Sequence, residues 1–228
     1  MTSSRNGSAL RSLLITVAMV LAAMGIAHGE ETSPMAMPSL LRGVRIGMAE
    51  DELHKVRPGA ERFELLGEPA VQGDDPNPLY TEVFSGSPFF DTASYLFCDR
   101  KLCAVTLASV GEGKAFAELQ AKIAQGALKK WGAKPERLLS LGVSQEREIE
   151  QRKRGALLWK EGTFRVLLTF ALASKAGPAD AALTIMDLKL LPEELRTTFF
   201  QSLTAIVPGQ DQHLFSPLEM QVASPLFE

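Results

Sequence analysis

The chain has little cysteine, no surplus of basic residues and few histidines. Its 228 residues include two cysteines and three histidines, with 24 Lys and Arg against 27 Asp and Glu. No basic cluster is longer than the RKR at 152–154, so the electrostatic footprint of a protein that binds phosphate backbones is missing. We therefore expect no nucleic acid partner.

The sequence also lacks the motifs of common enzyme classes. It has no glycine-rich phosphate loop, no G-x-S-x-G and no H-E-x-x-H. We expect no cofactor and no metal site, and we interpret the chain as a binding protein. The alternative is a small exported hydrolase that uses His54, with Asp51 three residues earlier on the same helix. A cleft between two halves of the chain would then hold the substrate.

One long apolar run is present, and it lies at the N-terminus. Residues 13–27 follow Arg5 and Arg11, and the small residues Ala27 and Gly29 come at its end. This pattern is typical of a secretory signal peptide, here cleaved after Gly29. An uncleaved membrane anchor is the alternative, but a spanning helix needs about 20 apolar residues. We expect a periplasmic or secreted protein with no integral membrane span after cleavage.

The mature protein is mildly acidic and carries no lipid-anchor signal. Removing residues 1–29 takes away two arginines and no acid, which leaves 22 basic against 27 acidic residues. No cysteine lies near the cleavage site, which excludes a lipid-anchored lipoprotein.

The two cysteines, Cys98 and Cys103, lie in the stretch YLFCDRKLCAVTL. An exported chain meets an oxidising environment, which favours a disulfide bond. If Arg100 and Lys101 form a two-residue turn, the cysteines face each other as a non-hydrogen-bonded pair with Cα atoms about 4.5 Å apart. Arg-Lys is a poor pair for such a turn, and a longer loop would loosen the pairing.

Two other roles for the cysteines are less favoured. A zinc site needs four ligands, and His54 and His213 are distant in sequence. A redox pair is usually C-x-x-C, whereas four residues intervene here.

The pattern of helices and strands predicts an α+β fold, with antiparallel sheet and helices packed on one face. We expect helices at 49–57, 114–131 and 192–207. The second of these has an apolar stripe with helical spacing, made by Phe116, Leu119, Ile123, Ala127 and Trp131. Strands are expected at 62–67, 80–86, 94–98, 102–109, 144–151, 156–160, 163–173 and 182–190, the run from Phe164 having the clearest alternation.

The chain divides into five segments and has a possible internal repeat. The segments are a signal peptide (1–29), a flexible leader (30–39), a first helix-plus-strands half (40–110), a second half (111–191) and a C-terminal helix with an extended arm (192–228). KVRPGAERFELLG from Lys55 and KWGAKPERLLSLG from Lys130 are identical at five of 13 positions, which favours two related halves over coincidence only weakly.

The stretch GVRIGMAEDELHKVRPG, followed by strands and by a helix ending in KKWGAKPE, resembles exported bacterial proteins of the SmpA/OmlA (BamE-like) and β-lactamase-inhibitory-protein-like group. Gly47, Met48 and Glu52 match the group's segment that opens a helix ahead of an antiparallel sheet. Ala49 replaces the hydroxyl residue that would cap that helix. The resemblance implies a non-enzymatic interaction module of the cell envelope.

Binding is therefore the function that the sequence favours. We expect the partner to be another envelope protein, held by an exposed sheet face or by the C-terminal arm, and a small molecule or lipid is also possible. The loop with Asp74, Asp75 and Asn77 lacks the spacing of a calcium loop, and we interpret it as a solvated turn.

Overall fold

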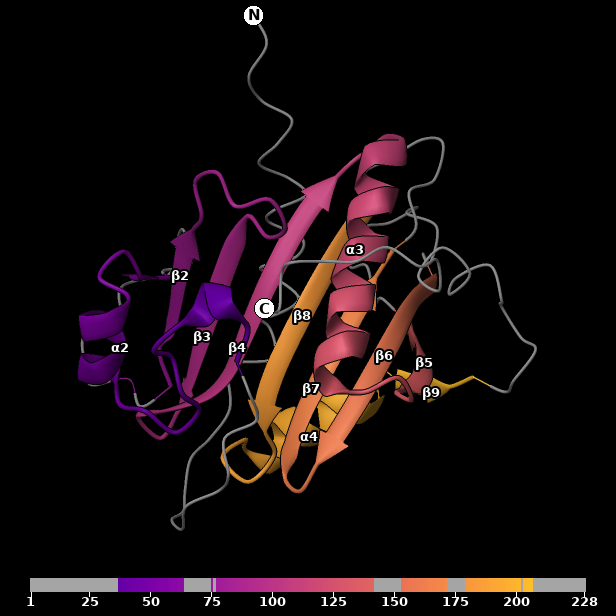
Figure 1. Cartoon of the computed structure of the whole chain (residues 1–228). Helices are drawn as coiled ribbons and strands as arrows, with labels where there is room; N and C mark the ends of the chain where they lie inside the picture. The colour runs from indigo at the N-terminus through magenta and orange to yellow at the C-terminus, as the bar shows by residue number, and fades with distance from the viewer. Residues whose placement is uncertain are drawn as a thin grey trace, which may run out of the picture.

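The fold is an antiparallel sheet flanked by helices (Figure 1). In a computed structural model of the whole chain, the structure describes residues 37–63, 75, 77–141, 153–171, 179–201 and 203–206. The predicted signal peptide, most of the leader, the predicted strand at 144–151 and the arm after Ile206 lie outside these residues. The α+β fold class is confirmed.

The elements follow one another in a simple order. The helices are η1 (Ser39–Leu41), α2 (Glu50–Val56), α3 (Gly113–Trp131) and α4 (Glu193–Gln201). The strands are β1 (Glu61–Arg62), β2 (Leu79–Val83), β3 (Thr92–Cys98), β4 (Lys101–Gly111), β5 (Glu136–Leu141), β6 (Lys153–Glu161), β7 (Phe164–Phe170), β8 (Ala179–Asp187) and β9 (Leu203–Ala205).

All nine strands join one sheet in the order β1-β2-β3-β4-β8-β7-β6-β5-β9. Every neighbouring pair is antiparallel. The centre of the sheet is the pair β4 and β8, with Val105 opposite Ile185 and Leu107 opposite Leu183. A single sheet therefore crosses the expected boundary at residues 110–111.

The main core lies between the sheet and the helices α2 and α3. Leu53 of α2 and Ile123 of α3 are fully buried in the same cluster as Val105 and Ile185. The predicted stripe on α3 is confirmed, since Phe116, Ile123 and Ala127 are buried and Leu119 and Trp131 pack against the same core.

The closing helix α4 packs on the other side of the sheet (Figure 1). Leu195 joins Ala104 and Met186 in a separate cluster. Their neighbours Val105 and Ile185 belong to the main core, and successive side chains of a strand point to opposite faces. The expectation that the helices pack on one face is therefore not confirmed.

The sequence prediction differs from the structure at two further elements. β5 was not predicted, because ERLLSL is short and its pairing with β6 and β9 is remote in sequence. The helix predicted at 192–207 ends at Gln201, and residues 203–205 instead form the edge strand β9.

Two glycines allow aromatic rings to lie against the backbone of the sheet. A Cβ atom at Gly155 would stand 2.3 Å from the Phe170 ring, and one at Gly111 would stand 2.2 Å from the Phe116 ring. Such distances leave no room for any side chain at these positions. Both rings belong to the main core.

Candidate functional site

The predicted disulfide bond between Cys98 and Cys103 is present, with Cα atoms 5.7 Å apart. Its register differs from the prediction. The turn consists of Asp99 and Arg100, both with positive φ (49° and 62°), so Cys98 pairs with Lys101. Positive φ at both central residues is the requirement of the turn that suits a two-residue hairpin, and Asp tolerates this conformation better than most residues.

A β-bulge next to this turn explains how the bond still forms. The register shifts between Leu96 and Phe97, so that Leu96 pairs with Ala104 while Phe97 pairs with Leu102. Cys103 is the extra residue of the bulge. Beyond the bulge, Val105 therefore lies on the face opposite the cysteines: it is buried in the main core with Tyr95, and the cysteines lie in the cluster beneath α4.

The burial of both cysteines makes the bond a structural clip. Cys98 and Cys103 are 3% and 0% exposed. Thiol–disulfide exchange requires access of an attacking thiolate to a sulfur atom. The bond therefore fixes the register of the β3–β4 hairpin and does not provide a reactive site.

His54 lies exposed on α2, beside a buried tyrosine. Its ring contacts the ring of Tyr80 edge-on, with the centroids 4.9 Å apart. The Tyr80 hydroxyl donates a hydrogen bond to Oε2 of Glu50 (2.6 Å). Burial and this hydrogen bond raise the pKa of Tyr80 to about 12, so the phenol stays neutral near pH 7.

Among the described residues, no nucleophilic side chain is hydrogen-bonded to His54. Both cysteines are bonded to each other, and within the described ranges no hydrogen bond joins His54 to a serine or threonine. Nucleophilic catalysis requires a nucleophile within hydrogen-bond reach of its base. His54 contributes a ring contact that packs α2 on β2.

A second polar cluster anchors the end of α2. Nε of Arg57 and the Tyr95 hydroxyl both donate to Oε2 of Glu82, each at 2.8 Å. The Arg57 and Glu82 side chains are 16% and 15% exposed. Burial and the hydrogen bond to Glu82 raise the pKa of Tyr95. Burial lowers the pKa of Arg57, but the contacts with Glu82 and Tyr95 outweigh it, so the net shift is upward.

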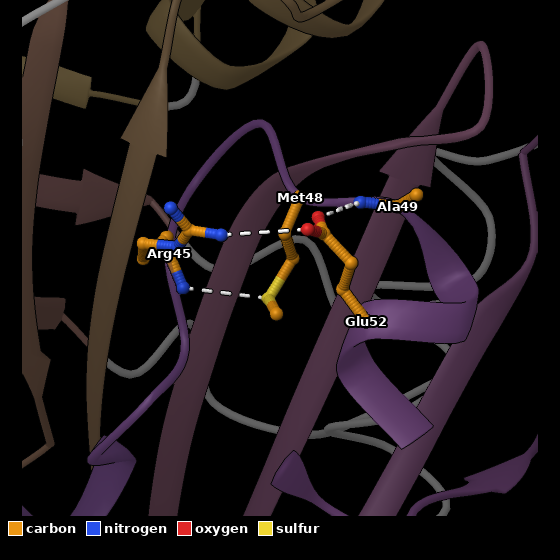
Figure 2. A network of polar contacts seen from close by, with 4 residues as sticks. All are labelled: Arg45, Met48, Ala49 and Glu52. Carbon is orange, nitrogen blue, oxygen red and sulfur yellow. Dashed lines mark hydrogen bonds and ion pairs between the residues drawn. The ribbon is translucent and has the colours of Figure 1, made fainter. Parts of the chain in front are cut away.

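In the segment before α2, Glu52 contacts both Arg45 and Ala49 (Figure 2). Oε2 of Glu52 accepts a hydrogen bond from the amide of Ala49 (3.0 Å), and Oε1 lies 3.4 Å from Arg45. Ala49 has no hydroxyl to return the contact, and its backbone carbonyl accepts from the amide of Glu52 instead. Half of the usual capping box is thus retained without Ser or Thr.

Backbone hydrogen bonds attach this segment to β4. The amide of Gly47, where φ is +87°, donates to the carbonyl of Leu102 (2.7 Å), and the Leu102 amide donates to Met48 (2.9 Å). The segment before α2 therefore continues the pairing of β4 at the end where β8 stops.

The predicted turn at residues 74–77 uses its polar groups internally. Asp75 accepts hydrogen bonds from the amide of Asn77 (2.9 Å) and from Arg62 (3.1 Å). Oδ1 of Asn77 accepts from the amide of Asp99 (2.9 Å). Asp74 lies outside the described residues, and in the described part of the chain no group of three His, Cys, Asp or Glu could hold a metal ion.

The face of the sheet opposite the main core carries hydroxyl and small side chains in register. Thr81, Ser94, Thr106 and Thr184 form one row across β2, β3, β4 and β8. The Thr106 and Thr184 hydroxyls lie 3.0 Å apart. A second row crosses the same strands and reaches β7. We call the two rows together the hydroxyl face; the second row consists of Val83, Thr92, Ala108, Ala182 and Thr169.

Helix α4 covers one end of this side of the sheet and leaves the hydroxyl face beyond it. Leu195 and Phe199 pack at the end that contains Met186 and Leu167. Among the described residues, Ala108 and Ala182 of the hydroxyl face belong to no hydrophobic cluster with a helix side chain. Its hydroxyl residues are half-buried, and Val83 is 73% exposed.

Comparisons with known proteins give no assignment for this site or fold. No family model matches the chain, and neither the curated proteins nor the solved structures contain a match. No described helix is both long and apolar enough to span a membrane.

Proposed function

We propose that this protein is an exported, non-enzymatic binding module that holds another envelope protein on the hydroxyl face. The observation that carries the proposal is the in-register row Thr81, Ser94, Thr106 and Thr184, on the part of the sheet face that lies beyond the contacts of α4. Short hydroxyl side chains present donors and acceptors without the large ordering entropy of Lys or Arg. Such side chains can form hydrogen bonds with another polypeptide.

A charge placed on the hydroxyl face tests this proposal. Thr184→Arg puts a bulky cation at the β8 end of the row, and Thr198→Arg puts the same residue at an exposed position of α4. The partner is captured by cross-linking in the native envelope fraction and identified by mass spectrometry. Thr184→Arg should abolish this capture, and Thr198→Arg should not. Equal capture by both variants, with normal melting of each, would place the contact elsewhere.

Export belongs to the same proposal. The apolar run at residues 13–27 and the bonded cysteines support passage through an oxidising compartment. The intact mass of the native protein should be that of a chain that begins at Glu30. Alkylation should add mass only after the protein has been reduced. A full-length mass with two free thiols would contradict export.

We also infer two related helix-plus-strands halves, as in the exported proteins that the sequence resembles. Helix α2 precedes the four antiparallel strands β1–β4, and α3 precedes the four antiparallel strands β5–β8. Both helices contribute to one core, and the two sets of strands meet where β4 pairs with β8. The bond that joins Gly47 to β4 gives the Gly-Met segment a structural role. A solved structure in which the halves do not superpose would refute the repeat.

A further inference from the structure

Two arginines and a threonine near α4 have buried donors that lack acceptors. The Nε atoms of Arg165 and Arg196 and the hydroxyl of Thr163 are buried, and among the described residues none of them has a hydrogen-bond partner. A buried donor without an acceptor costs free energy, and the cost is larger for a charged group. Buried polar groups of native proteins are mostly hydrogen-bonded, so these three donors indicate an acceptor beyond the described residues.

The fold brings Arg165 and Arg196 to the same end of one sheet face. Arg165 of β7 lies opposite Met186 of β8. Met186 belongs to the same buried cluster as Leu195, the residue before Arg196. Consecutive helix residues are about 100° apart around the axis, so Arg196 borders the side of α4 that packs on the sheet. Both guanidinium groups therefore adjoin the cluster that contains Met186 and Leu195.

The guanidinium of Arg165 is fixed at the turn between β6 and β7. Its Nη1 donates to the carbonyls of Gly162 and Phe164, each at 2.7 Å. The edge formed by Nε and Nη2 is left, and such an edge can make two parallel hydrogen bonds to an oxyanion. The carbonyl of Thr163 accepts from the amide of Leu188 (3.0 Å). The turn is therefore joined to the segment that leads into α4, at the same end of the sheet (Figure 1).

The positive charge of the two arginines is not neutralised within the described residues. Neither Arg165 nor Arg196 forms an ion pair there. Lys160, which lies opposite Arg165 on β6, is paired with Glu136. Glu193, three residues before Arg196, is exposed. Two like charges near each other are unfavourable, and an anion held by both would remove this cost.

We propose that Arg165, Arg196 and Thr163 form a binding site for a phosphate group. The two guanidinium charges match a phosphate monoester, which carries about −1.5 to −2 near pH 7. Its three oxygens can accept from two guanidinium groups and a hydroxyl that belong to different elements, whereas one guanidinium already satisfies a planar carboxylate. The phosphate is either free in solution or the headgroup of a phosphomonoester lipid. The site shares no residue with the hydroxyl face, so the proposal is independent of the proposed function.

Calorimetric titration of the native protein with inorganic phosphate, at constant ionic strength, tests the site. One phosphate should bind per chain, and Arg196→Gln should weaken binding about tenfold or more, because charge-assisted hydrogen bonds are lost. Arg45→Gln is the matched control, since the Arg45 side chain is 67% exposed and contacts only Glu52. Equal effects of the two variants would show unspecific attraction between charges and overturn the proposal.

Co-sedimentation with vesicles separates the two sources of phosphate. Vesicles of phosphatidylcholine that contain phosphatidic acid present the lipid phosphomonoester, and pure phosphatidylcholine is the control. Binding to the first vesicles only, with no titration by inorganic phosphate and with loss in Arg196→Gln, assigns the site to a lipid headgroup. Titration by inorganic phosphate without co-sedimentation assigns it to the free ion. Absence of binding in both experiments would overturn the proposal.

A third variant keeps the test valid if an arginine is needed for folding. Arg165→Gln also removes the bonds to the β6–β7 turn, so Thr163→Val is used instead. It deletes a buried hydroxyl that has no partner among the described residues, and the melting temperature without phosphate should not fall. Affinity for phosphate, or for the phosphatidic acid vesicles, should drop several-fold. Unchanged affinity in both Thr163→Val and Arg196→Gln would overturn the proposal.

Discussion

Two regions of one sheet hold their helices by different interactions. In the region up to Gly111, α2 has seven residues, and polar contacts to Tyr80 and Glu82 attach it. In the region from Gly113, α3 has 19 residues and buries an apolar stripe. A helix of two turns is unstable alone, so it needs directional anchors, whereas a five-turn helix is held by the area it buries.

The aromatic residues offer a separate probe for each region. Both tyrosines of the chain, Tyr80 and Tyr95, lie in the first region, and both tryptophans, Trp131 and Trp159, lie in the second. Tyrosine ionisation therefore reports on the region of α2, and tryptophan fluorescence on the region of α3. The Trp131 and Trp159 rings have centroids 5.9 Å apart.

The largest expected loss in the free energy of unfolding comes from the buried apolar stripe of α3. Ile123→Ala removes a fully buried side chain from α3 and leaves a cavity between helix and sheet. We expect a loss of about 4 kcal/mol in the free energy of unfolding, measured by urea denaturation with tryptophan fluorescence. Lys122→Ala, at an exposed position of the same helix, should change it by less than about 0.5 kcal/mol. Similar losses for both variants would show that α3 is held by something other than its stripe.

The matching change on the polar side is Glu82→Ala. It leaves Arg57 and the Tyr95 hydroxyl without their acceptor in a largely buried site. We expect a loss of about 3 kcal/mol, because an uncompensated buried charge remains. Val83→Ala, next in sequence and 73% exposed, is the control. If Glu82→Ala were no worse than Val83→Ala, the polar anchoring of α2 would be unnecessary.

The disulfide bond distinguishes the two regions further, because both cysteines of the chain lie in the first region. Closing so short a loop restricts the unfolded chain, so Cys98→Ala with Cys103→Ala should lower the free energy of unfolding by about 2 kcal/mol. In urea, where unfolding exposes the bond, dithiothreitol should lower the free energy of unfolding of the wild-type protein by a similar amount and leave that of the double variant unchanged. A native protein that is insensitive to the reductant under unfolding conditions would argue against the bond.

Local patterns predicted α3 and β7 better than the β3–β4 hairpin. The stripe on α3 and the alternation of β7 depend only on residues close in sequence, and both are present as predicted. The hairpin turn was misplaced by one residue, because DRKL has no glycine to mark the positive φ that Asp99 and Arg100 adopt. The bulge then places Val105 and Leu107 on the face opposite the cysteines.

The hydroxyl face could not be predicted at all. Its threonines come from five strands that are distant in sequence, and they line up only once β4 pairs with β8. That pairing joins residues about 80 positions apart, such as Thr106 and Thr184. No local period carries such information. To predict a candidate binding surface on a sheet face, one therefore needs to know the register of every strand that contributes to it.

The smallest expected effect is a pH dependence confined to the region of α2. Tyr80 has a pKa near 12 in the folded chain, against about 10 when unfolded. The folded state therefore keeps its proton while the unfolded state loses it, and the free energy of unfolding should fall as pH rises from about 10 to 12. Tyr80→Phe should reduce this decline and leave the stability change caused by Ile123→Ala unaffected. Tyr95, whose pKa is also raised, accounts for a remaining slope, so the double Phe variant is the control in which both tyrosine contributions are absent. An unchanged slope in that double variant would show that the polar anchors of α2 do not govern alkaline stability.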